Sequence, residues 1–205
     1  MHIVDGALSN PVVIGGAVAA AGGIALGLRA LPLERIPAAG VLSAAFFVAS
    51  LIHVPIGPSS VHLMLNGLAG LILGWAAFPA LFVGLLLQAI FFGFGGLTVL
   101  GVNAVNIALP AVLVGMLFRP LLMRGSPIMA AVWGGLGGAL AIALTTLMVA
   151  VSLMLSGDEF LAAAHLVFVA HLPIMVLEGL LTGFAVLLAH KVKPDLFHSM
   201  KEIAS

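Results

Sequence analysis

Long apolar stretches, separated by short clusters of Pro, Gly and charged residues, make up most of the chain. Stretches with almost no charge are typical of helices in a bilayer. Dividing the sequence at the polar clusters predicts seven helices, at residues 10–29, 37–52, 60–74, 78–92, 102–119, 127–155 and 160–190. The third and fourth are short, about 22 Å each against a hydrocarbon core of about 30 Å, so we expect them to be embedded among longer helices.

The basic residues predict an orientation, because cytoplasmic loops of membrane proteins carry an excess of Lys and Arg. They follow the first, fifth and seventh predicted helices, at Arg29, Arg35, Arg119, Arg124, Lys191, Lys193 and Lys201. With seven spans all of them lie on one side, and Asp5, Asp158 and Glu159 lie on the other. We therefore expect an all-α integral membrane protein with seven transmembrane helices, the N-terminus outside and the C-terminus cytoplasmic.

Composition supports a membrane protein and narrows its chemistry. Hydrophobic residues are 63% and charged residues 7% of the chain, where soluble domains carry about 45–50% and about 25%. The formal net charge is zero, which gives no reason to expect nucleic acid as a partner. Cysteine is absent, so disulfides, thiolate catalysis and thiolate metal sites are excluded. His, Met, carboxylates and backbone nitrogens are left as metal ligands.

We expect one membrane domain over residues 1–205, with a polar N-terminal segment at 1–9 and a cytoplasmic tail at 191–205. No basic residue precedes the first apolar stretch, and His2 and Asp5 stand there instead. This differs from a secretory signal peptide. Met1 is therefore interpreted as the mature N-terminus.

The start of the chain, Met1-His2, is a candidate chelate. A free α-amine, the backbone nitrogen of residue 2 and the His2 imidazole can close two fused rings around one ion. A fourth nitrogen would complete the tetragonal geometry that Ni(II) or Cu(II) favours. His62, at the expected outer end of the third helix, is the first candidate, and His53 is its rival. Taken singly, His2 is equally an ordinary polar residue of a terminus, and His62 a capping or packing residue.

Further polar residues are expected around this site. Asn66, four residues after His62, would share its helix face and bond either the imidazole or the N-terminal segment, with a plain interhelical hydrogen bond as the alternative. Asp5 is expected to anchor the terminus or to be solvated. Asn103 and Asn106 would border the site from the fifth helix.

Three titratable residues, His165, His171 and Glu178, lie on the seventh predicted helix. His171 and Glu178 are two turns apart on one face. A metal relay is one interpretation, but we favour a polar pair satisfied inside the bundle, because intramembrane polar groups need partners.

Four ordered segments, MHIVDGALS, IGPSSVHLMLNGLAGLILG, LLLQAIFFGFGGLTVLGVNAVN and HLPIMVLEGLLTG, resemble the substrate-binding membrane subunits (S components) of energy-coupling-factor (ECF) transporters for nickel and cobalt, the NikM/CbiM type. The resemblance covers nearly the whole chain. It implies a seven-helix S component in the cell inner membrane whose metal ligands are the Met1 amine, the His2 backbone nitrogen and imidazole, and His62 rather than His53.

The resemblance also implies partners: a transmembrane coupling (T) subunit, cytoplasmic ATPase subunits and often a small accessory membrane protein. The chain itself has no phosphate-binding loop, so ATP hydrolysis would belong to those partners and the chain would not be an enzyme. The opening DG is more like the nickel branch than the cobalt branch, so we expect Ni²⁺ as transported substrate, with Co²⁺ as the alternative. Phe94 departs from the family, which often has His or Asp there, whereas Gly93, Gly95 and Gly96 still predict a sharp turn.

Two other classes of function fit less well. An intramembrane metalloenzyme would need a pattern such as H-E-x-x-H, which the sequence lacks. An ion channel or secondary transporter would have charged residues along several spans, whereas Glu178 is the only acidic residue deep within one.

Overall fold

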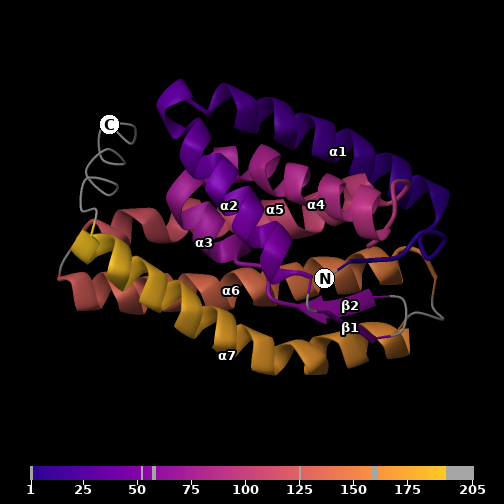
Figure 1. Ribbon diagram of the computed structural model, residues 1–205. Coiled ribbons are helices and arrows are strands. Elements are labelled where there is room, and N and C mark those ends of the chain that lie inside the picture. Colours follow the sequence, from indigo (N-terminus) through magenta and orange to yellow (C-terminus); the bar gives the residue numbers. More distant parts are fainter. Residues whose placement is uncertain (1, 52, 57–58, 125, 158–160, 193–205) are drawn as a thin grey trace.

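The computed structural model describes residues 2–51, 53–56, 59–124, 126–157 and 161–192, with only the backbone described at 53–56, 59–61 and 161–165. Helices account for most of this part of the chain (Figure 1): α1 (Asn10–Arg29), α2 (Ile36–Ala49), α3 (Asn66–Leu73), α4 (Ala77–Phe92), α5 (Leu100–Leu122), α6 (Pro127–Met154) and α7 (Leu161–Val192). Two short 3-10 helices, η1 (Leu33–Arg35) and η2 (Gly74–Ala76), and a hairpin of β1 (His53–Ile56) and β2 (Ser59–His62) complete the described elements.

Proline and serine mark where two of the longest helices begin. Ser9 precedes α1, whose second residue is Pro11. Ser126 caps α6 by accepting a hydrogen bond from the Met129 amide at 3.3 Å, and Pro127 is the first helical residue. Proline suits this position because the first-turn amides have no intrahelical acceptor. These local signals explain why the predicted starts at residues 10 and 127 agree with the structure.

Helices α4 and α5 lie in the middle of the bundle, with α1 and α2 on one side and α6 and α7 on the other (Figure 1). Helix α3 crosses α5 so closely that a Cβ on Gly70 would overlap the Ala111 carbonyl oxygen. Helices α6 and α7 also approach closely, since a Cβ on Gly135 would lie 3.0 Å from the Gly179 carbonyl oxygen. The small residues at 134–138 therefore serve packing within the fold.

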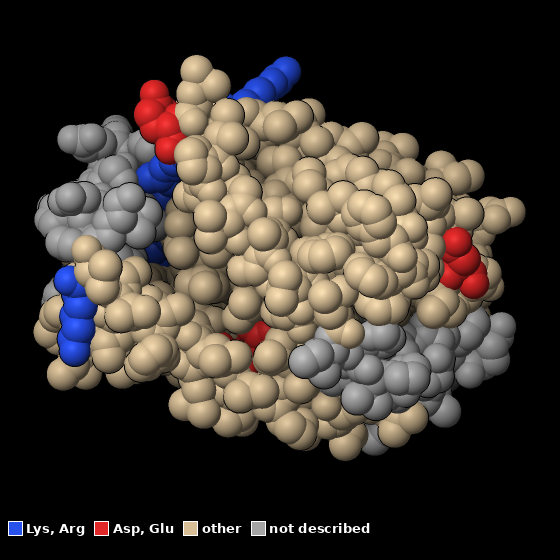
Figure 2. All heavy atoms as spheres, viewed as in Figure 1, with Lys and Arg blue, Asp and Glu red and all other residues tan. Residues whose placement is uncertain are grey.

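Five segments of the described structure are long and apolar enough to cross a membrane: Asn10–Arg29, Asn66–Phe92, Leu100–Leu122, Pro127–Met154 and Leu166–Val192. Only 17% of the hydrophobic window in the first and in the last of these is buried inside the protein. Apolar faces of this kind suit a lipid surrounding, so the chain is a multi-pass membrane protein. On the face seen in Figure 2, Lys and Arg gather toward one end, and the wide middle is almost free of charge.

The predicted third helix is wrong at its start. Residues 59–62 form β2, which pairs antiparallel with β1 so that His53 lies opposite His62. Helix α3 begins only at Asn66, after Leu65 adopts a positive φ of 51°. Apolar content alone does not separate a short strand from the first turn of a helix. His62 and Asn66 consequently do not share a helix face.

Candidate metal centre

The N-terminal segment is held between the start of α5 and the turn after α4. Ile3 is fully buried, and its amide donates to Asn103 Oδ1 at 2.9 Å while its carbonyl accepts from Asn103 Nδ2 at 3.0 Å. This two-way bond satisfies both backbone groups of a buried residue, which would otherwise be costly to desolvate. Asn103 thus borders the N-terminal segment, as the sequence predicts.

Asp5 holds the same segment two residues after Ile3. Its carboxylate accepts from the Thr98 hydroxyl and from the Val99 amide, the latter at 3.3 Å. Gly95 and Gly96 make room for this contact at φ values of 76° and 103°, and a Cβ on Gly96 would overlap the Asp5 carboxylate. The predicted non-helical glycine turn is therefore confirmed, and Asp5 takes the anchoring role.

His2 and His62 meet in the interior of the protein. His2 is 3% and His62 2% exposed, and their rings stack at a centroid distance of 4.7 Å with 27° between the planes. His2 Nδ1 and His62 Nε2 are 3.1 Å apart. The fold thus brings together residues 60 positions apart in sequence, one from the N-terminal segment and one from the end of β2.

Each imidazole has a second nitrogen that faces away from the other histidine, and the hydrogen bond of that nitrogen shows which one carries the proton. His2 Nε2 lies 2.7 Å from Gln88 Oε1, an amide oxygen that only accepts, so this nitrogen carries the proton. His62 Nδ1 lies 2.8 Å from the Leu63 carbonyl oxygen, which likewise only accepts. In the neutral rings His2 Nδ1 and His62 Nε2 are therefore both unprotonated and present lone pairs.

Burial favours the neutral form of His62. Burial lowers the pKa of its imidazole to about 4, although the hydrogen bond to the Leu63 carbonyl raises it in part. Neutral imidazole is the form that binds a metal ion.

Two lone-pair nitrogens 3.1 Å apart suit adjacent positions on one cation. Two ligands at right angles, each about 2.0–2.1 Å from a metal, are separated by about 2.9 Å. Within the described residues no group of three or more His, Asp or Glu side chains is placed to hold a metal ion. Met1 lies outside the described residues, so its ligand role stays a prediction.

The remaining predicted site residues lie elsewhere or are not described. Asn66 donates to the Ile107 carbonyl and to Thr145 Oγ1, both at 3.0 Å, so it forms the interhelical bond rather than one to the imidazole. His53 belongs to β1, but its side chain lies outside the described part of the structure.

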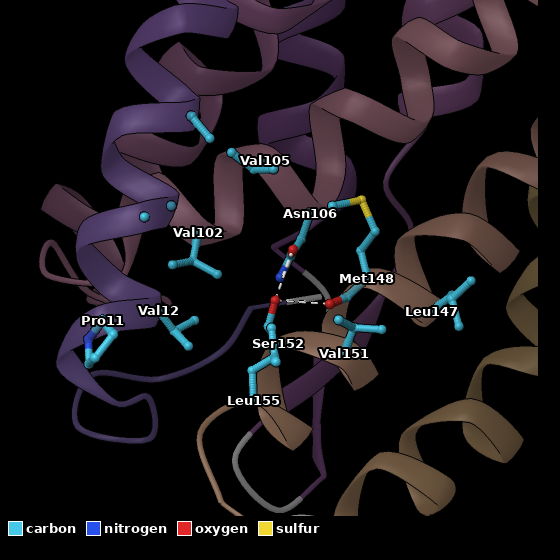
Figure 3. A pocket seen from close by; sticks show the side chains of 13 residues that line it. Pro11, Val12, Val102, Val105, Asn106, Leu147, Met148, Val151, Ser152 and Leu155 are labelled. Carbon is cyan, nitrogen blue, oxygen red and sulfur yellow. Dashed lines mark hydrogen bonds between the residues drawn. The ribbon is translucent and has the colours of Figure 1, made fainter.

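Asn106 joins α5 to α6. Its Oδ1 accepts from Ser152 at 3.1 Å, and it lines a largely apolar groove of about 640 Å³ between α1, α5 and α6 (Figure 3). Asn103 therefore contacts the N-terminal segment, whereas Asn106, three residues further along α5, contacts α6.

The expected pairing of His171 with Glu178 is also wrong. His171 Nδ1 bonds the Val167 carbonyl at 2.6 Å, within its own helix. Glu178 instead accepts from the backbone amides of Met64 and Leu65, the latter at 2.9 Å. Glu178 therefore holds the irregular backbone that directly follows His62, a role that the sequence analysis missed. The side chain of His165 is not described.

Gln88 and Ser50 were missed as well. Both side chains are fully buried, and Gln88 joins His2 to Ser50. The available signal was a single amide in the apolar helix 77–92, where an unpaired polar group is costly. Phe94 also lies near the site, with its ring centroid 6.1 Å from that of His2.

Comparisons with known proteins identify the family of the chain. Residues 2–196 match the family model described as the cobalt uptake substrate-specific transmembrane region. A protein of Haemophilus influenzae named for metal transport is 43% identical over 200 residues, which cover 97% of each chain. The cobalt transport protein CbiM of Geobacter sulfurreducens is 30% identical over 98% of this chain and 62% of its own.

Another relative is named for nickel transport, and a solved structure has the same fold. The fused nickel transport protein NikMN of Rhodobacter capsulatus is 39% identical over 49% of this chain, which is 29% of its own length. A crystal structure of a transition metal transporter superposes with a TM-score of 0.75 at 27% identity, over 94% of this chain and 93% of the other.

Proposed function

Because the chain belongs to the family of cobalt uptake substrate-specific transmembrane components, we propose that it is the substrate-binding membrane subunit of an ATP-driven importer of the ECF type. It captures a divalent transition metal at the outer face. The observation that carries this proposal is the buried pair of ring nitrogens, His2 Nδ1 and His62 Nε2, 3.1 Å apart.

Four nitrogens make up the proposed site. The Met1 amine, the His2 backbone nitrogen and His2 Nδ1 close the two fused rings, and His62 Nε2 occupies the fourth position. The contacts of Ile3 with Asn103 and of Asp5 with Val99 support this proposal, because they hold the segment that carries the chelate. A ligand set on a fixed backbone loses little conformational freedom when the ion binds.

Nickel is the proposed ion, since a planar all-nitrogen set favours Ni²⁺. Cobalt is the second candidate, favoured by the description of the matching family. The names of the similar proteins include both metals. Competition between the two ions for the purified protein distinguishes the candidates.

The proposed membrane arrangement keeps seven transmembrane helices in one domain over residues 1–205, with segment 1–9 outside and the tail 191–205 in the cytoplasm. The basic end of the molecule seen in Figure 2 supports this orientation in the inner membrane. The proposed partners are a transmembrane coupling subunit, cytoplasmic ATPase subunits and a small accessory membrane protein.

The test is metal binding by the purified protein with a native N-terminus and any affinity tag at the C-terminus. A Gly-Ser-Gly extension before Met1 removes the terminal amine from the chelate and should abolish tight Ni²⁺ binding. A one-residue extension is unsuitable, because it would make His2 the third residue and create a four-nitrogen chelate that does not need His62. Unchanged affinity in the Gly-Ser-Gly variant would refute the site.

His62→Ala provides the matched side-chain test. It should weaken Ni²⁺ binding more than about 100-fold, beyond the 10–100-fold typical of residues that only orient a ligand. His53→Ala, on the paired strand, should change affinity by less than about 3-fold. The reverse order of effects would mean that the fourth ligand is misassigned.

A further inference from the structure

Gln88 is a buried amide in an otherwise apolar helix, directly beneath the proposed site. Its Oε1 accepts from His2 Nε2 at 2.7 Å, and its amide nitrogen donates to Ser50 Oγ. The Ser50 hydroxyl in turn donates to the Phe46 carbonyl at 2.5 Å. A chain of hydrogen bonds thus joins the His2 ring to the backbone of α2.

The Phe46 end of this series of hydrogen bonds determines which group donates in each of them. The Phe46 carbonyl only accepts, so the single hydroxyl proton of Ser50 points toward it and the Ser50 lone pairs face Gln88. The Gln88 amide nitrogen must therefore face Ser50, which turns Oε1 toward His2. A reversed amide would leave its oxygen beside a hydroxyl without a proton to donate, or would draw that proton away from the Phe46 carbonyl; either way one buried hydrogen bond is lost.

We propose that Gln88, oriented by Ser50, is a positioning residue that keeps the His2 proton on Nε2 and so reserves Nδ1 for the metal ion. Only Nδ1 can close a six-membered ring with the backbone nitrogen of its own residue, because Nε2 lies too far around the imidazole. The position of this proton therefore decides whether His2 can chelate. This inference rests on the proposed function and names the residue that orients its ligand.

Binding strengthens the same contact. A cation on Nδ1 withdraws electrons from the ring and makes the Nε2 proton more acidic, so the bond to Gln88 Oε1 becomes stronger in the occupied state. Hydrogen bonds to metal-bound imidazoles fix the tautomer and ring orientation in this way, and their removal costs about 10–100-fold in metal affinity.

The experiment combines metal affinity with the ¹⁵N NMR spectrum of histidine-labelled protein, both with a native N-terminus. Gln88→Met keeps the length and removes the hydrogen bonds; it should lower Ni²⁺ affinity by about 10–100-fold and give the His2 ring a mixture of tautomers before metal is added. Asn66→Met is the matched control, because it removes an equally buried amide that bonds other helices. It should lower thermal stability and leave both readouts unchanged.

Ser50→Ala tests the inference without altering Gln88, and replaces Gln88→Met should that variant fail to fold. It frees the amide to reverse, so the tautomer mixture should appear with a smaller loss of affinity. The role of Gln88 would be overturned if Gln88→Met kept wild-type affinity and a His2 ring protonated only on Nε2. If only Ser50→Ala folds, the same result in that variant would overturn it. A wild-type protein that binds neither Ni²⁺ nor Co²⁺ would instead refute the proposed function, while its spectrum still reports the tautomer of His2.

Discussion

Replacing Gly96 with Ala should loosen the N-terminal segment and so weaken metal binding. The new methyl group overlaps the Asp5 carboxylate, and the residue stands at φ 103°, outside the range that alanine adopts readily. The backbone strain costs about 1–3 kcal/mol whether or not the segment is docked. The overlap is different, because it disappears when residues 2–9 leave their position, and it therefore disfavours the docked state specifically.

The loss of affinity follows from this second effect. Displacing Asp5 removes its hydrogen bonds from the Thr98 hydroxyl and the Val99 amide. Asp5 is exposed, so we take about 1–2 kcal/mol for the contacts and the overlap together, less than for a buried charged pair. If the undocked state becomes favoured by that amount, the apparent affinity for Ni²⁺ falls about 5–30-fold.

Gly93→Ala is the matched control in the same turn. Gly93 also has a positive φ, 66°, but a Cβ there meets no atom within 4 Å. It should lower the free energy of unfolding by about 1 kcal/mol and leave the affinity unchanged. Gly95→Ala should fall between the two, because its Cβ would lie 2.8 Å from Asn103 Nδ2 and 3.3 Å from the Cβ of His2.

Isothermal titration with Ni²⁺ and thermal unfolding of the same preparations measure the two quantities. In an Asp5→Ala background the Gly96→Ala change should cost little further affinity, since the overlapping carboxylate is gone. Equal losses of affinity in Gly93→Ala and Gly96→Ala, or a full additional loss in the double variant, would refute the reasoning.

Substitutions at three further positions test the packing around the site. Asn103→Leu leaves both backbone groups of Ile3 without partners, at about 1–3 kcal/mol each, and hydrogen exchange should increase at residue 3. Glu178→Ala removes the acceptor for two amides that follow His62 and should reduce both Ni²⁺ affinity and melting temperature, whereas Glu178→Gln should retain part of both. Gly70→Ala forces α3 away from Ala111 and should prevent stable folding, detected by loss of the monodisperse species on gel filtration.

The sequence by itself determined the broad architecture. The long apolar stretches predicted the helices seen at Asn10–Arg29 and Pro127–Met154. Their first residues were predicted correctly because proline and serine favour helix starts through local backbone chemistry. The Gly-rich turn was also predicted, since a run of glycines at the end of an apolar helix indicates positive φ. For Asp5, anchoring was one of two alternatives that the sequence left open.

The tertiary structure alone decided the surroundings of His62. Residues 60–62, predicted as the first turn of a helix, belong instead to β2, which is formed by pairing with β1, and periodicity does not report pairing between strands. Helix α3 therefore begins four residues after His62 instead of before it. Asn66 consequently faces Ile107 and Thr145 rather than the site.

The proton assignment at His2 was likewise beyond the sequence. Gln88 lies 86 residues from His2 and 38 from Ser50 along the chain, so no local pattern connects them. The sequence alone predicts that Met1-His2 can offer three nitrogens to a metal ion. Which nitrogen of the ring faces His62 depends on hydrogen bonds between distant segments, and only the folded chain brings those segments together.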